Sequence, residues 1–82
     1  VYVTGQVLKP GSFPLTTPTT VMQALAMAGG LSEFAKKDDI AVIRVIDGKT
    51  QRRRFNYRDV LKGKKLEQNV ELRPGDTVIV PD

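Results

Sequence analysis

The sequence predicts an α+β domain: a mixed sheet of about five short strands with one main helix packed across it. Two observations carry this prediction. Short runs rich in Val, Ile, Thr and Phe are separated by Gly, Pro and Asp, which is typical of strands joined by turns. One segment alone, residues 20–30, combines helical periodicity with signals for both helix ends. A single apolar helix hides its face best against such a sheet, so we expect two layers.

Composition limits the classes of function. The chain has 82 residues, of which 40% are hydrophobic and 27% charged, as in an ordinary globular domain. We expect one domain over residues 1–82. No stretch reaches the roughly 20 consecutive apolar residues of a membrane helix. Cys and His are both absent, which removes disulfides, zinc clusters and the commonest general base. The formal charge of +4 favours acidic partners without identifying them.

The N-terminal segment is predicted to form two strands joined by a turn. Residues 1–8 alternate, with Tyr2 on the face opposite three Val residues. Gly5 interrupts this strand and indicates a bulge or a close backbone approach. Pro10 and Gly11 are the residue types that a type II turn prefers at its two central positions. A short edge strand is expected to follow in residues 12–15.

The main helix is predicted from its ends inward. Thr20 has the position of an N-cap and Gln23 stands three residues later, which completes a capping-box pattern. The apolar stripe of residues 21–28 then stops at Gly29 and Gly30, where a left-handed residue closes the last turn. The double Gly also resembles a phosphate loop, but no Gly-Lys-Ser/Thr sequence follows, which favours the cap.

The second half is predicted to return to strand. Residues 40–46 and 50–55 flank an Asp-Gly turn and should pair as a hairpin. A short helical turn is expected in residues 56–63, and a last extended run, residues 69–81, bends at Pro74 and Gly75. Together with the helix, this order of elements is the outline of a β-grasp (ubiquitin-like) fold.

No catalytic site is apparent, and we expect neither enzymatic activity nor a cofactor. Hydroxyl side chains are plentiful but stand without a base, and Asp38 and Asp39 are adjacent, so they point apart. Asp76 follows Pro74 and Gly75, where its carboxylate can accept amide hydrogens that the turn leaves unpaired. We therefore interpret Asp76 as structural.

The run Arg52, Arg53 and Arg54 is the strongest local feature. In an extended strand the first and third share one face, while Arg53 shares the other with Phe55. One interpretation is a solvated strand whose charges discourage edge pairing. The other is contact with an anionic sugar or an acidic partner, to which planar guanidinium groups are suited.

One face of the sheet is expected to stay open. If the helix covers the face of the third strand that carries Ala41, the opposite face presents Val42 and Ile46 on either side of Arg44. Tyr2 and Ile79 would lie on that same outer face. Because one helix cannot cover both sides, we expect a partly apolar interface there. The alternative is that residues 56–63 fold over it.

Four stretches carry a resemblance to a known family: VTGQVLKPGSFPL, TVMQALAMAGGLS, IAVIRV and NVELRPGDTVIVP. In this order they resemble the soluble-ligand-binding β-grasp (SLBB) domain of bacterial outer-membrane polysaccharide export proteins. The chain begins at Val1, inside a strand and without an initiating Met, so we interpret it as a fragment of a longer export protein.

The resemblance implies a non-catalytic periplasmic module of a ring-forming channel for capsule or exopolysaccharide. It implies neighbouring copies as partners, with an inner-membrane polymerase or chain-length regulator and an anionic polysaccharide as further candidates. One alternative is a direct carbohydrate-binding module, although two Tyr and no Trp make a poor stacking platform. Another is a DNA-uptake module, but no helix-hairpin-helix is present and aromatic residues near the basic run are few, so a nucleic-acid partner is not expected.

Overall fold

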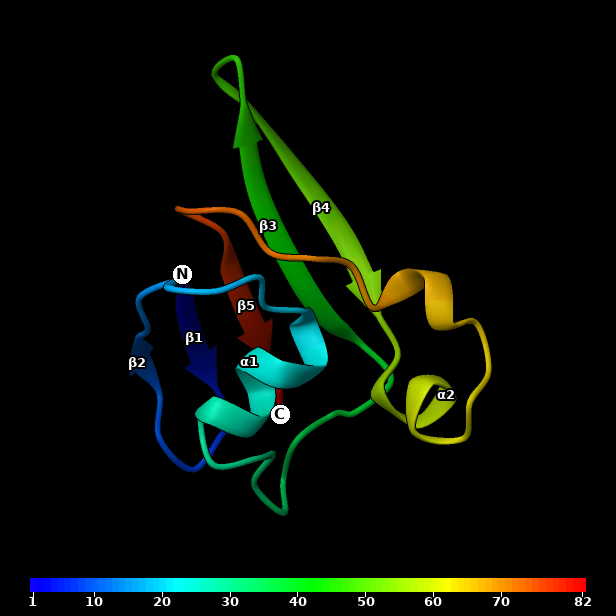
Figure 1. The fold of residues 1–82 in the computed structure, drawn as a ribbon. Helices are drawn as coiled ribbons and strands as arrows, with labels where there is room; N and C mark the ends of the chain where they lie inside the picture. Colours follow the sequence, from blue (N-terminus) through cyan, green and yellow to red (C-terminus); the bar gives the residue numbers. More distant parts are fainter.

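The computed structural model describes residues 1–82 and confirms the predicted α+β fold (Figure 1). Five strands form one sheet in the order β2-β1-β5-β3-β4. The strands are β1 (Tyr2–Gly5), β2 (Gly11–Ser12), β3 (Ile40–Ile46), β4 (Lys49–Phe55) and β5 (Thr77–Val80). The helices are α1 (Val21–Met27), α2 (Tyr57–Leu61) and a 3₁₀ turn, η1 (Leu66–Gln68). Strands β1 and β5 run parallel and the other neighbours antiparallel, so the sheet is mixed.

The core lies between α1 and one face of the sheet, with α1 in front of the strands in Figure 1. The register places Val3, Val78 and Val42 side by side on three neighbouring strands. All three belong to the buried cluster, together with Val21 and Leu25 of α1. None of the helices is long and apolar enough to cross a membrane.

Both ends of α1 are closed as the sequence pattern predicts. The Thr20 hydroxyl accepts a hydrogen bond from the Gln23 amide, and the Gln23 side chain accepts one from the Thr20 amide. At the other end Gly29 and Gly30 have φ of 82° and 87°, and the Gly30 amide donates to the Leu25 carbonyl. The Gly29 amide also donates to the Ala26 carbonyl, and the two hydrogen bonds together form the Schellman arrangement, which satisfies open carbonyl groups at the helix end.

Residues 69–73, here named the crossing segment, depart from the predicted strand. They do not join the sheet but cross in front of β3 on the α1 side (Figure 1). The Val70 carbonyl accepts from the Val21 amide, and the Asn69 side chain accepts from the Met22 amide. Because the first amides of a helix have no partner within it, the start of α1 draws this extended segment away from the strands.

Only one of the two Pro-Gly pairs forms the predicted tight turn. At Pro74-Gly75 the Asp76 amide donates to the Arg73 carbonyl and Gly75 has φ 89°, as in a type II turn. Gly11 instead has φ 157° and already pairs in β2, so the type II prediction for Pro10-Gly11 is wrong. The chain reverses over residues 6–10, because the Leu8 and Lys9 amides donate to carbonyl groups at the end of α1.

The β3–β4 hairpin fixes which side chains share a face. Asp47 and Gly48 both have positive φ, as the two-residue type I′ turn requires. The resulting register pairs Val42 with Arg53 and Ile43 with Arg52. In Figure 1 the turn end of this hairpin projects beyond the rest of the sheet.

The prediction for the side of β3 that faces outward is wrong. Val42 is only 3% exposed and belongs to the core, and Ile46 shares its side of the strand. Both faces of β3 carry apolar residues, and the side with Arg44 packs inward because a buried carboxylate meets that charge there. Tyr2 and Ile79 do lie on the opposite face, with Ile79 beside Ala41.

Gly5 ends β1 at a close approach between backbones. A Cβ at this position would collide with the Val80 carbonyl oxygen, and φ is 92°. We expect Gly5→Ala to lower the free energy of unfolding by at least about 2 kcal/mol, since it adds a collision to the cost of a left-handed residue. Urea denaturation followed by circular dichroism measures the change.

Gly63→Ala is the matched control for Gly5→Ala. Gly63 has a similar φ of 78°, but no atom lies within 4 Å of its added Cβ. We expect this substitution to cost only about 1 kcal/mol. Equal losses in the two variants would show that the contact with Val80 does not require glycine.

Candidate functional site: a basic groove and an open sheet face

A buried ion pair between Arg44 and Asp76 lies on the α1 side of the sheet. The Arg44 guanidinium holds the Asp76 carboxylate through Nε at 3.0 and 3.2 Å and through Nη2 at 2.7 Å. Nη2 also donates to the Glu71 carbonyl at 3.2 Å. The side chains are 17% and 2% exposed, respectively. Arg44 thus joins β3, the residue before β5 and the crossing segment.

Asp76 remains ionised because its hydrogen-bond donors outweigh its burial. Burial by itself raises the pKa of Asp76, but hydrogen bonds from Arg44 and from the Arg73 amide bring that pKa below its usual value. The same hydrogen bond raises the pKa of Arg44 above its ordinary value, against the opposing effect of burial. Arg44, predicted as a ligand contact, is therefore committed to an internal partner.

A groove of about 400 Å³ lies beside this ion pair, and we name it the basic groove. Arg53 of β4 and Arg73 of the crossing segment both line it, and neither forms an ion pair. The groove is lined by Arg44, Arg53, Val70, Glu71, Leu72 and Arg73. With Asp76 included, three cationic groups meet two carboxylates, which leaves a net positive charge.

The structure divides the arginine run between the two faces of the sheet. Arg53 pairs in register with Val42 and therefore lies on the α1 side, whereas Arg52 and Arg54 lie on the opposite side. Arg54 donates to the Asp38 carbonyl at 2.9 Å and lies 3.7 Å from an Asp39 oxygen. The four predicted contact residues, Arg44 included, do not form one site.

The outer sheet face, on the side away from α1, is partly apolar and open. Tyr2 is 53% exposed and Val45 65%, and residues 56–63 do not cover them, because Tyr57 packs beside α1 instead. Two rows cross this face from β1 to β4. They are Tyr2, Thr77, Ile43 and Arg52, and Thr4, Ile79, Ala41 and Arg54, of which only Ala41 is buried.

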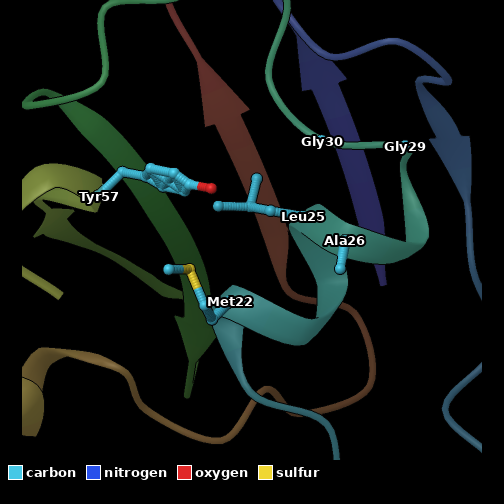
Figure 2. A pocket seen from close by; sticks show the side chains of 6 residues that line it. All are labelled: Met22, Leu25, Ala26, Gly29, Gly30 and Tyr57. Carbon is cyan, nitrogen blue, oxygen red and sulfur yellow. The ribbon is translucent and has the colours of Figure 1, made fainter. Parts of the chain in front are cut away.

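A second groove lies between α1 and the start of α2 (Figure 2). The Tyr57 ring points toward Leu25, and Met22 and the Gly29-Gly30 end of the helix complete the lining of about 370 Å³. Ligand sites combine an apolar lining with several convergent polar groups, and here the Tyr57 hydroxyl stands alone. We therefore assign no ligand to this groove, and Tyr57 and Val60 of α2 pack with the core. Elsewhere, no group of three or more acidic side chains is placed to hold a metal ion.

Sequence reasoning missed both Arg73 and the partner of Arg44. A signal for the partner was present, because Val78 and Val80 face the core and the same alternation places Asp76 inward. A buried carboxylate needs a cation, and Arg44 is the only charge within the apolar run of residues 40–46. Arg73 could not be found in this way, since its position depends on the path of the crossing segment.

The chain matches the family model of the SLBB domain over residues 1–80. The match spans nearly the whole chain, and the sheet with one main helix is the β-grasp fold expected of that family. The chain therefore belongs to the SLBB domain family.

Asp76→Asn tests the energetic importance of the ion pair. The substitution keeps the shape of the side chain but leaves Arg44 buried without a counter-charge. We expect the free energy of unfolding to fall by about 3 kcal/mol, as measured by urea denaturation at neutral pH. Asp82→Asn removes the same charge at an exposed position and should change stability by less than about 0.5 kcal/mol. Similar losses in both variants would contradict this role.

The pH dependence of stability provides a second test. The folded pKa of Asp76 is lowered, so its stabilising contribution is complete above the unfolded pKa of about 4 and is lost as pH falls through the lower folded value. The stability difference between the wild type and Asp76→Asn should therefore be largest near neutral pH and shrink below about pH 4. A difference that stays constant down to about pH 2 would argue against an ionised pair.

Proposed function

Because the chain is an SLBB domain, we propose that it is a non-catalytic module of a bacterial outer-membrane polysaccharide export protein and acts in the periplasm. Its outer sheet face packs against a neighbouring copy of the same protein, and repetition of that contact closes a ring. An inner-membrane polymerase or chain-length regulator is a further candidate partner. The module's work is to bind and position, with no bond made or broken in it.

The open outer sheet face is the observation that carries this proposal. Tyr2, Val45 and Ile79 are 53%, 65% and 39% exposed on a surface where a second layer would normally pack. Tyr and Arg are enriched at interface cores, and the row from Tyr2 to Arg52 places one at each side of the patch. A head-to-tail contact between copies would bury these side chains.

The two faces of the sheet suit different parts of this function. The α1 side is closed by the core and by the Arg44–Asp76 pair, which hold the strands in one arrangement. A rigid sheet presents its outer face without reorganisation, which reduces the cost of association.

Cell fractionation tests the proposed compartment and channel. We expect the full-length protein that contains this domain to be found in the cell envelope. We also expect that deleting its gene leaves newly made capsule or exopolysaccharide inside the cell. Recovery of the protein in the cytoplasm alone, or unchanged polysaccharide secretion after deletion, would contradict the export role.

Val45→Asp in the full-length protein tests the packing face. A carboxylate at this position would be desolvated in an apolar contact, so we expect the dissociation constant between copies to rise at least about tenfold. Sedimentation velocity over a range of protein concentrations measures this constant. Leu61→Asp is the control, because Leu61 on α2 is similarly exposed (68% against 65%) but lies away from the outer sheet face. Equal weakening by both substitutions, or by neither, would exclude this face as the contact.

A further inference from the structure

We infer that the basic groove binds a carboxylate of an acidic sugar chain, held between Arg53 and Arg73. The inference deepens the proposed function, on which the choice of a sugar as ligand rests. The inferred binding residues are not the continuous arginine run that the sequence suggested but two arginines that lie 20 positions apart in sequence. Arg53 and Arg73 line the same groove without forming an ion pair there.

A backbone donor without an acceptor in the chain, the Glu71 amide, belongs to a residue that lines the same groove as the two arginines. The bridge between Thr20 and Glu71 is of the kind in which the neighbouring residues exchange hydrogen bonds, through Val70 and Leu72. The amide and carbonyl of Glu71 therefore both point away from α1, toward Arg44. The carbonyl accepts from Arg44, whereas the amide has no acceptor in the chain. A bound carboxylate would satisfy this amide.

Arg44 shapes the groove but does not supply its binding charge. Its guanidinium is occupied by Asp76 and by the Glu71 carbonyl, so its charge is largely compensated. The same contacts hold the crossing segment against β3, and the bond from the Arg73 amide to Asp76 fixes the backbone position of Arg73. Arg44 is thus a positioning residue, and Arg53 and Arg73 are the contact residues.

Glu71 favours a sugar over an acidic peptide. Glu71 is exposed and lines the same groove, so its carboxylate would repel a ligand that offers carboxylates alone. An acidic sugar carries hydroxyl groups beside its carboxylate, and these can donate to Glu71. Val70 and the buried Leu72 supply the apolar part of the groove lining, against which the ring carbons of a sugar could pack.

The test is an amide-resolved NMR titration of the chain with short oligogalacturonates, followed at low and high salt. We expect saturable shifts at the Glu71 amide and at the Nε–H groups of Arg53 and Arg73, weakened by salt. The same oligosaccharides with methyl-esterified carboxyl groups are the neutral control and should not bind. Absence of saturable shifts at Glu71, or equal binding of the ester, would overturn the inference.

Matched variants separate the groove from the general charge of the domain. Arg53→Gln and Arg73→Gln should each raise the dissociation constant at least about tenfold, because each removes a charged hydrogen-bond donor. Arg52→Gln removes the same charge one residue away on the opposite face and should change it less than about twofold. If Arg52→Gln weakens binding as much as Arg53→Gln, attraction is diffuse and the groove is not a site.

Two further ligands test the commitment to a sugar. Oligoglutamate with the same number of carboxylates should bind at least about tenfold more weakly than oligogalacturonate. Glu71→Gln should reduce this difference in dissociation constant, because it removes the repulsion between Glu71 and the peptide carboxylates. Tighter binding of oligoglutamate would identify an acidic peptide as the ligand and overturn the inference. Shifts of equal affinity with inorganic phosphate would do the same by showing a site for small anions only.

Failure here and failure of the proposed function are distinguishable. A negative titration leaves the packing role of the outer sheet face intact, because Arg53 and Arg73 take no part in it. Recovery of the full-length protein in the cytoplasm would remove the export role, while a positive titration would still stand as a property of the groove.

Discussion

The arrangement of this domain depends on the ion pair between Arg44 and Asp76. Removing two charges from water is costly. Here the Asp76 carboxylate accepts hydrogen bonds from two nitrogens of the Arg44 guanidinium and from the Arg73 amide. Apolar replacements of buried ion pairs are often no less stable, so the pair is better explained by the position it imposes. Arg44 also bonds the Glu71 carbonyl, which fixes the crossing segment, and the other side of that segment closes the start of α1.

In a chain of 82 residues with one main helix, the ion pair also determines which side of the sheet is covered and which stays open. The α1 side is completed by the helix, the crossing segment and the ion pair, and nothing comparable closes the other side. Arg52 and Arg53 are adjacent in sequence, yet they contribute to surfaces on opposite sides of the sheet. A basic run in a strand therefore divides its charges between two faces. The charge on each face must be judged together with the neighbouring residues on that face.

Local signals were sufficient for much of the fold. Thr20 with Gln23, Gly29 with Gly30 and the Asp47-Gly48 turn each act within a few residues, so α1 and the hairpin were predictable. The orientation of β3 was not, because both of its faces are apolar and the deciding contact joins residues 32 positions apart. The sequence predicts a strand at the crossing segment for a related reason: its residues pair as an extended segment does, but their partners lie at the start of α1.

The opposed placement of the basic groove and the outer sheet face bears on how a ring could handle a sugar chain. If one surface served both purposes, packing between copies would bury the guanidinium groups that a ligand needs. Here Arg53 and Arg73 lie on the α1 side, so contact through Tyr2 and Val45 leaves them accessible. The two surfaces also differ in their physical chemistry, since salt screens the groove but hardly affects apolar packing. The proposed assembly and the proposed ligand contact would therefore not compete for the same surface of this small domain.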